Sequence, residues 1–320
     1  MTLSDFHNLD FLDKTSVLVV GDIMLDQYIC GNVNRISPEA PVPIVDINCE
    51  FQTLGGAANV AANLASLGVK CELLGIVGAD RAGDELRMEL KKQGIKFEWF
   101  IRSSTITKTR IVAHKQQICR IDKEQSPFSY SIDETSLIEV LKQTAKKYDA
   151  VIISDYAKGV VSQCVIDALR TVESQKNLFL ALDPKPKHQL DIRGLDLLTP
   201  NRNEALQLSG LIEGGCSNEE IAQKIIEDSY PANLVITLGE NGMLLAQSND
   251  IITYPTMAKQ ISDVSGAGDT SVAVLTVAMA GGLPAKQAVQ LANMAAGIVV
   301  GKFGTATATR DELKNAIIGL

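Results

Sequence analysis

The octapeptide Asp-Val-Ser-Gly-Ala-Gly-Asp-Thr, at residues 263–270, has the residue types and spacing of a site for phosphoryl chemistry. An apolar run of helical length follows it, so Gly266, Ala267 and Gly268 are expected to form the turn at which a helix begins. The free N–H groups and the positive dipole end of a helix start favour a phosphate or another developing anion. Asp269 would repel that anion, which favours a role as general base: it takes a proton from a hydroxyl while the backbone amides stabilise the phosphoryl group. The alternative is an ordinary helix start that Asp269 caps.

This octapeptide resembles the C-terminal signature of the ribokinase-like (PfkB-type) carbohydrate kinases. In that family the Gly-Ala-Gly amides form an anion hole and the following Asp is the catalytic base. A second string, Leu-Gly-Gly-Ala-Ala-Asn-Val-Ala from residue 54, resembles the family's N-terminal signature and implies sugar contacts from Gly55, Gly56 and Asn59. By itself, a Gly-Gly pair before a helix is more often a turn than a site. The signatures stand in the family's order, and the resemblance extends over nearly the whole chain.

Two acids follow the first apolar β run, residues 16–20. Asp22 and Asp26 would stand at the ligand-facing end of a buried parallel strand. Carboxylates accept hydrogen bonds from hydroxyl groups, and an Asp in this region contacts the sugar in the family that the chain resembles. For Asp22 the alternative is capping or turn formation.

The string Pro-Asn-Arg-Asn-Glu, at residues 200–204, resembles the family's Asn-x-x-Glu motif. The resemblance implies that Asn201 and Glu204, with Arg202 and Asn203 between them, lie at the nucleotide. Glu204 would hold Mg²⁺ through water, which suits a hard cation that prefers oxygen ligands and keeps its own waters. Taken alone, the same four residues are an ordinary helix start with a capping box.

Three further positions match nucleotide contacts of the family. Thr237 and Gly239 would face the phosphates and ribose of ATP, and Gly242 belongs to the same glycine turn. Asn293 matches the position that meets the adenine. An isolated Asn within a helix is more often a satisfied polar residue, and that alternative stays open.

Two β-rich segments, at about residues 30–50 and 100–122, are predicted to form a small β lid over the active site. Prolines exclude a central strand in the first segment. The second segment is typical of a hairpin, with its turn near Lys115 and Gln116. In the family such a lid is often shared across a dimer, so a homodimer is expected.

A phosphorylated sugar would need cations in an otherwise acidic protein. Lys108 and Arg110 in the predicted lid, and Lys185 after a strand of the main sheet, are the residues expected to bind its phosphate. For the cations of the lid the alternative is a solvated strand face.

The rest of the chain alternates β runs with helical runs, which predicts an α/β fold: a mostly parallel central sheet with helices on both faces, in one kinase domain over residues 1–320. The uncharged runs at residues 270–285 and 287–301 are each too short to span a bilayer and favour a buried helical hairpin. Polar groups cluster after strand ends in Asp-Tyr-Ala-Lys-Gly from residue 155 and in Asp-Pro-Lys from residue 183.

Composition excludes several classes of protein. With 320 residues, 46% of them hydrophobic, the chain is long enough for a large core, and its net charge of −8 argues against a general binder of nucleic acid or anionic membranes. Six scattered cysteines suggest neither a zinc site nor a disulfide framework. The N-terminus lacks the apolar run of a secretory signal, so a cytoplasmic protein is expected. No complete P-loop or dinucleotide fingerprint is present.

Within the family, several strings resemble the bacterial kinases that phosphorylate D-glycero-D-manno-heptose 7-phosphate at C1 with ATP and Mg²⁺, for ADP-heptose and lipopolysaccharide core synthesis. Among them are Arg-Ile-Ser-Pro-Glu-Ala-Pro-Val-Pro from residue 35 and Ser-Asp-Tyr-Ala-Lys-Gly from residue 154. Many relatives carry a C-terminal nucleotidyltransferase domain, which the sequence is expected to lack because it stops at Leu320. The alternatives are the same machinery acting on fructose 6-phosphate, ribose or a hexose, and a catalytically silent sugar-binding regulator.

Overall fold

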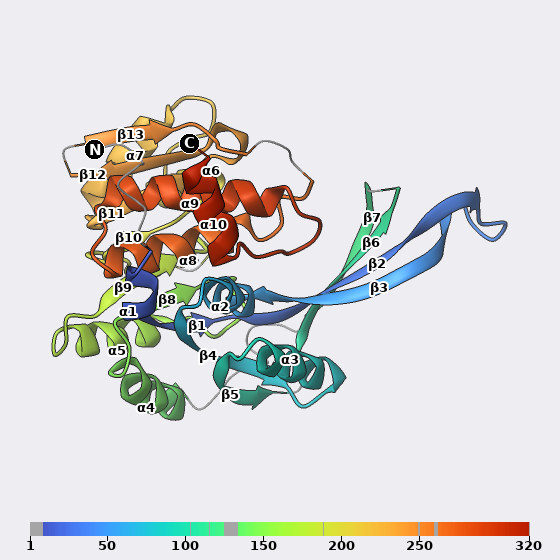
Figure 1. Cartoon of the computed structure of the whole chain (residues 1–320), viewed down its shortest axis with the longest axis horizontal. Coiled ribbons are helices and arrows are strands. Elements are labelled where there is room, and N and C mark those ends of the chain that lie inside the picture. Colours follow the sequence, from blue (N-terminus) through green and yellow to red (C-terminus); the bar gives the residue numbers. More distant parts are fainter. Residues whose placement is uncertain are drawn as a thin grey trace.

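The computed structural model describes residues 9–319, except residues 103, 115, 125–133, 188, 249 and 259–261. Two β-sheets organise it (Figure 1). The main sheet has nine strands and is covered by helices on both faces. The second sheet has four strands and extends away from the body as a long ribbon.

The strand order of the main sheet is β13-β12-β11-β10-β9-β8-β1-β4-β5. The strands from β11 to β5 in this order are parallel, and β12 and β13 are antiparallel at one edge. Their bounds are Ser16–Gly21 (β1), Lys70–Gly78 (β4), Lys96–Arg102 (β5), Ala150–Ser154 (β8), Phe179–Asp183 (β9), Leu197–Leu198 (β10), Asn233–Thr237 (β11), Met243–Gln247 (β12) and Asp250–Tyr254 (β13).

Successive side chains of β1 point to opposite faces of the main sheet, and both faces are buried. Val17 and Val19 point into one hydrophobic core, while Leu18 and Val20 point into the other, and all four are fully buried. Each such side chain contributes about 1.5–3 kcal/mol by leaving water. The predicted mostly parallel α/β sheet is therefore confirmed.

The helices divide between the two cores. The first core is covered by α1 (Phe11–Lys14), α2 (Ala57–Ser66), α3 (Arg81–Lys92), α8 (Ala267–Ala280), α9 (Ala285–Val300) and α10 (Arg310–Ile318). The second is covered by α4 (Glu134–Ala145), α5 (Gln163–Glu173), α6 (Arg202–Ser209) and α7 (Asn218–Ser229). The consecutive helices α8 and α9 pack against each other within the first core, as expected for the predicted hairpin. Across the described part of the chain, no helix is both long and apolar enough to cross a membrane.

The second sheet has the order β3-β2-β6-β7. Its strands are β2 (Ile23–Ile36), β3 (Pro43–Gly56), β6 (Ile106–Ala113) and β7 (Gln116–Lys123). The predicted segments, at about 30–50 and 100–122, therefore differ from the observed strands at their ends. The first is too short, because β2 begins at Ile23 and β3 continues to Gly56. The second begins too early, because residues 100–102 belong to β5. The predicted hairpin is present, although Lys115 in its turn lies outside the described residues.

Strand register gives the second sheet two distinct faces. Asp26 pairs with Lys108 of β6 and Thr53 of β3, whereas Gln27 pairs with Thr109 and Gln52. Because side chains alternate along a strand, these two rows lie on opposite faces. We call the face of Asp26 and Lys108 the site face, and the face of Gln27 the outer face.

Candidate active site

Several of the predicted site residues, together with Tyr156, lie at the carboxyl edge of the main sheet. Asp22 follows β1, Tyr156 follows β8, Lys185 follows β9, and Asn201 and Gly239 follow β10 and β11. In open parallel sheets, ligands bind outside this edge. The beginning of α8 lies at the same edge, since cavities there are lined jointly by Gly268 and Thr237.

Helix α8 begins within the predicted turn. Gly266 is its N-cap with φ of 83°, in the left-handed region that favours glycine, and Ala267 is the first helical residue. The N–H groups of a first turn have no intrahelical acceptor. A Cβ added to Gly268 would meet no atom within 4 Å, so the backbone is open to a ligand there.

Asp269 is held in the first turn of α8 by two hydrogen bonds. Asn59 donates from Nδ2 to Oδ2 at 2.7 Å, and Tyr156 donates its hydroxyl to Oδ1 at 2.7 Å. Burial raises the pKa of Asp269 from 3.8 to about 6, against the opposing effect of the two donors. At neutral pH the carboxylate is therefore mostly ionised and can accept a proton, as a general base requires.

A chain of buried side-chain hydrogen bonds between α2 and α8 holds Asn59 and Asp269 in this arrangement. Thr270 donates its hydroxyl to Asn63 Oδ1 at 2.8 Å, and Asn63 Nδ2 donates to the carbonyl oxygen of Asn59 at 2.9 Å. All three residues are buried. The two signatures, far apart in sequence, are thus joined at Asn59 and Asp269.

Gly266→Ala is expected to weaken this junction. Its Cβ would lie 2.8 Å from Asn59 Nδ2 and 3.0 Å from Thr305 Cγ2, in addition to the left-handed backbone strain of about 1–2 kcal/mol. We expect a lower midpoint of urea unfolding and a turnover reduced at least tenfold. Gly282→Ala, also at positive φ but with no atom within 4 Å of an added Cβ, is the control for backbone strain alone. An equal loss of turnover in both variants would contradict the steric argument.

Two cavities meet at the start of α8. One of about 610 Å³ is bounded by α8, α9 and the glycine turn after β11, and one of about 220 Å³ contains Asp269, Gly266 and Lys185. Asn201, Thr237 and Gly268 line both. A ligand that fills the larger cavity can therefore present one end beside Asp269.

The larger cavity contains most of the predicted nucleotide residues: Thr237, Gly239, Gly242, Asn293, Asn201 and the predicted anion-hole residue Ala267. Asn293 donates from Nδ2 to the carbonyl oxygen of Pro255 at 2.6 Å, so it is also the satisfied polar residue of the alternative interpretation. Arg202 and Asn203 line neither cavity. Arg202 donates from Nε to Asn218 Oδ1, which joins α6 to α7, so the prediction of its nucleotide contact finds no support in this geometry.

The smaller cavity is rich in carboxylates. Asp155, Asp183, Glu204 and Asp269 line it, and the pKa of Asp183 is raised well above 3.8 by burial and by Glu204 and Asp269. Asn201 and Glu204 form the capping box at the start of α6 that the sequence left open as an alternative. Glu204 also pairs with Lys185, at 2.8 Å from Oε1 to Nζ.

These oxygens are of the type that Mg²⁺ prefers, but they are largely engaged with the protein itself. Among the described residues, no group of three or more His, Cys, Asp or Glu side chains is placed to hold a metal. That donor set fits an ion bound mainly by nucleotide phosphates and water, with Glu204 and Asn201 beside it, rather than a protein cage.

On the other side of Asp269 stands the site face of the second sheet. Asp26 is buried, accepts a hydrogen bond from Thr305 Oγ1 at 3.1 Å, and pairs with Arg110 at 2.9 Å. The Arg110 guanidinium also lies 5.3 Å from the ring centroid of Tyr28. Lys108 is half-buried, and burial lowers its pKa. Within the described residues its ammonium lies within 4.0 Å of no carboxylate, and it stands 5.4 Å from the ring centroid of Tyr156.

Gly55 and Gly56 permit the close approach of β2, β3 and α2. A Cβ on Gly55 would lie 2.9 Å from Asp26 Oδ2, and one on Gly56 would lie 2.4 Å from the carbonyl oxygen of Asp22. Asp22 itself is 1% exposed and accepts backbone N–H groups from Tyr156, Lys158 and Val160. The geometry therefore favours the structural alternative for Asp22, whereas Asp26 stays oriented to the site.

Lys185 does not join the other two predicted phosphate ligands. It lies in the small cavity with Glu204, on the nucleotide side of Asp269, whereas Lys108 and Arg110 lie on the second sheet. This position does not support the predicted contact of Lys185 with the phosphate of a sugar.

Sequence reasoning gave no individual role to several residues of the site. Tyr156, Asp155 and Asp183 belong to polar strings that the sequence flagged only as groups after strand ends. Thr305 and Asn63 carried no separable signal, because a Thr after a Gly and an Asn within a helix are common. Only the tertiary contacts show that they bind Asp26 and Thr270.

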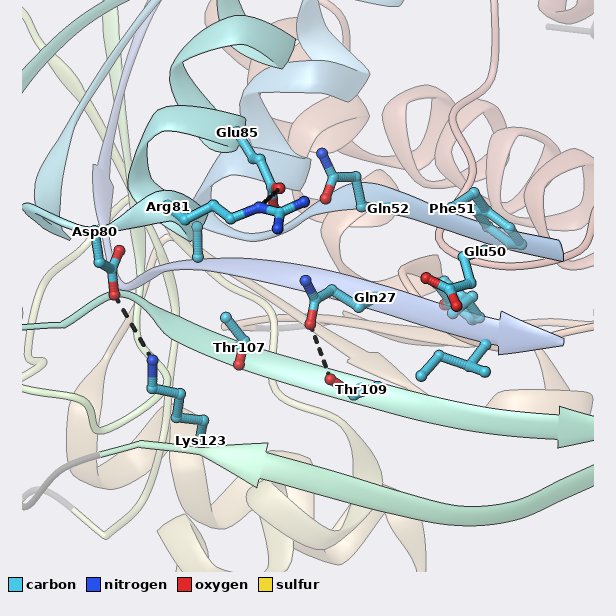
Figure 2. A pocket seen from close by; sticks show the side chains of 13 residues that line it. Gln27, Glu50, Phe51, Gln52, Asp80, Arg81, Glu85, Thr107, Thr109 and Lys123 are labelled. Atoms are coloured by element: carbon cyan, nitrogen blue, oxygen red, sulfur yellow. Dashed lines mark hydrogen bonds and ion pairs between the residues drawn. The ribbon is translucent and has the colours of Figure 1, made fainter. Parts of the chain in front are cut away.

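A further cavity, of about 770 Å³, lies on the outer face of the second sheet beside α3 (Figure 2). Gln27 and Thr109 from the sheet, and Arg81 and Glu85 from α3, point toward it, and Lys123 pairs with Asp80 at its rim. Because Asp26 and Lys108 lie on the opposite face, this cavity is separate from the carboxylate of Asp269.

The chain is similar to known proteins over nearly all of its length. The model of the pfkB family of carbohydrate kinases matches residues 14–312. The chain is 42% identical over 306 residues to the bifunctional protein HldE of Trichlorobacter lovleyi, covering 94% of this chain and 62% of that protein. It is 42% identical over 313 residues to HldE of Histophilus somni, covering 96% and 64%. The chain thus spans less than two thirds of the length of these relatives.

Solved structures share its fold. Phosphofructokinase-2 from Escherichia coli, in complex with substrates and products, superposes with a TM-score of 0.78 at 18% identity, covering 96% of this chain and 99% of that one. Ribokinase of Arabidopsis thaliana, complexed with ribose and ATP, gives 0.72 at 19% identity, covering 95% and 98%. These likenesses show a ribokinase-like fold. The family match over residues 14–312 shows that the chain belongs to the pfkB family of carbohydrate kinases and is a sugar kinase.

Proposed function

We propose that this kinase transfers the γ-phosphoryl group of ATP to a hydroxyl group of a sugar phosphate, with Asp269 as general base. One observation carries the proposal: the buried carboxylate of Asp269, with a pKa near 6, stands at a helix start. It lies between a nucleotide-sized cavity and the site face of the second sheet, which carries Lys108. That is the arrangement that proton removal and phosphoryl transfer need.

In the proposed mechanism, ATP occupies the 610 Å³ cavity with its phosphates directed to Gly268. The sugar lies between Asp269 and the site face, with Asp26 and Asn59 as hydrogen-bonding groups. Asp269 accepts the hydroxyl proton as the sugar oxygen bonds to the γ-phosphorus and the bond to the β-phosphate oxygen breaks, which releases ADP. Mg²⁺ on the phosphates, beside Glu204 and Asn201, would neutralise charge, and the amides at the start of α8 would stabilise the group in transfer.

We further propose D-glycero-D-manno-heptose 7-phosphate as the substrate, with phosphorylation at C1 to give the 1,7-bisphosphate for ADP-heptose synthesis. The sequence strings shared with heptose 7-phosphate kinases carry this choice, and the 42% identity to the HldE proteins supports it. Lys108 supports a phosphorylated substrate, because a half-buried ammonium with no carboxylate partner among the described residues is costly unless an anion joins it. Since ATP is the donor, we place the reaction in the cytoplasm.

The test is ADP release by the purified protein with ATP and Mg²⁺, compared across heptose 7-phosphate, fructose 6-phosphate, ribose and unphosphorylated heptose. Turnover restricted to heptose 7-phosphate supports the substrate proposal. Turnover on another sugar retains the mechanism and replaces the substrate, and the absence of turnover on all four would favour the sugar-binding regulator.

We also propose that the chain forms a homodimer through the second sheet. This sheet exposes large apolar side chains, among them Ile47 at 54% and Ile121 at 55%, on a ribbon that stands away from the body (Figure 1). Such exposure on an extended sheet is typical of a covered surface.

The double variant Ile47→Lys/Ile121→Lys is expected to convert a dimer of twice 34.4 kDa into a monomer, measured by light scattering after size exclusion. Ile212→Lys, at a residue 86% exposed between α6 and α7, is the control and should leave the dimer intact. A monomeric wild-type protein would refute the proposal.

A further inference from the structure

We propose that Tyr156 is a positioning residue that orients and restrains the carboxylate of Asp269. The inference rests on the proposed role of Asp269 as general base. It begins from the pair of donors on that carboxylate: Tyr156 binds Oδ1 and Asn59 binds Oδ2, each at 2.7 Å. One donor on each oxygen fixes the plane of the carboxylate, and each oxygen keeps lone-pair capacity for a substrate hydroxyl.

The main chain around Tyr156 is itself restrained. Its N–H and that of Lys158 both donate to Asp22 Oδ2 at 2.9 Å, and the N–H of Ala157 donates to Asp155 Oδ1 at 2.8 Å. Ala157 has φ of 56°, a conformation that non-glycine residues rarely adopt and that the surrounding hydrogen bonds maintain. The role of Asp22 is thus to fix the segment that carries Tyr156.

The ring of Tyr156 is fixed as well. Met24 and Ile106 of the second sheet pack with it, and the Lys108 ammonium lies 5.4 Å from its centroid. Tyr156 therefore contacts both the second sheet and the reacting carboxylate. Burial and the nearby carboxylates raise its own pKa well above 10, so its hydroxyl stays protonated and acts as a donor rather than as an acid or base.

The hydroxyl of Tyr156 affects the pKa of Asp269 together with the charged groups around that carboxylate. Asp26 raises the pKa of Asp269 and Lys108 lowers it, both from the second sheet, and the half-buried Asp183 lies near enough to interact. Other ionisable groups line the small cavity, namely Asp155, Lys185 and Glu204. In this desolvated position the two hydrogen bonds stabilise the ionised form, so the loss of one should favour the protonated form.

Tyr156→Phe removes the donor and keeps the ring. We expect the acid limb of the profile of kcat/KM against pH, near pH 6 in the wild type, to move upward by about one pH unit. At pH 8, kcat should fall about 5–20-fold, since the carboxylate is less restrained. KM for the sugar should change less than about threefold, because the hydroxyl is not assigned to the substrate.

Tyr148→Phe is the matched control, because the Tyr148 hydroxyl also donates to a carboxylate, that of Glu72, away from the site. It should leave the acid limb in place. A Tyr156→Phe limb that stays at the wild-type pH, or an increase in KM with unchanged kcat, overturns the inference. A wild-type protein inactive on every sugar would instead refute the proposed function. An Asp269→Asn variant with full wild-type activity would refute the role of the base, so the failures are distinguishable.

Discussion

Asp269→Asn should lower kcat by about 10²–10⁴-fold, the usual contribution of a positioned general base. The side chain is nearly isosteric, so Asn59 can still donate to its oxygen, and the Tyr156 hydroxyl can turn to accept from its NH₂ group. The variant should therefore fold and bind ATP. The measurement is ADP release at pH 8 with saturating ATP and sugar.

The same substitution should not destabilise the protein. Burial raises the folded-state pKa of Asp269. The contribution of the protonated side chain to the free energy of unfolding is therefore fully present below pH 3.8 and is lost as the pH rises through about 6. This shift corresponds to about 3 kcal/mol of unfolding free energy against the ionised form at pH 8. We expect the urea midpoint of Asp269→Asn at pH 8 to equal or exceed that of the wild type, with a smaller difference at pH 5.

Two results would count against this assignment. Full turnover in the variant would remove Asp269 from the mechanism. A variant that is inactive but also strongly destabilised at pH 8 would show that the carboxylate is structural, as the capping alternative holds. Measuring turnover and unfolding on the same preparation separates these cases.

Lys108→Met should lower kcat/KM for heptose 7-phosphate by about 10–100-fold, which is the value of a charge-assisted hydrogen bond to an anion. Activity toward unphosphorylated heptose, where it is measurable, should change less than about threefold. The reason is that Lys108 faces the site without a carboxylate partner among the described residues, whereas Arg110 is already paired with Asp26.

Lys123→Met is the matched control for this prediction. Lys123 lies in the same sheet but lines the outer cavity, where it faces Asp80 at 3.9 Å (Figure 2). It should retain wild-type kinetics. An equal loss with both sugars in Lys108→Met would show that Lys108 supports the active site generally, and unchanged kinetics would transfer the phosphate contact to another cation.

Much of this protein could be predicted from local patterns. The apolar runs at residues 16–20, 150–154 and 234–238 predict buried parallel strands, because a strand covered on both faces has no need of polar alternation. The glycine at 266 predicts a helix start, because a residue tolerant of positive φ fits the turn, and its φ is 83°. These features depend on neighbours in sequence, and they suffice for the α/β fold class and for the position of Asp269.

The partners of those residues were decided by the tertiary structure. Asp22 and Asp26 look equivalent in sequence, but one receives three backbone N–H groups from a segment more than 130 residues away and the other faces Arg110 and Thr305. Lys108 and Lys185 are both lysines near strand ends, and only the register of the second sheet and the ion pair with Glu204 separate them. Tyr156 acquires its contact with Asp269 through the packing of β8 beside α8. A side chain's partners across such sequence distances depend on how sheets and helices close over one another, which local periodicity does not encode.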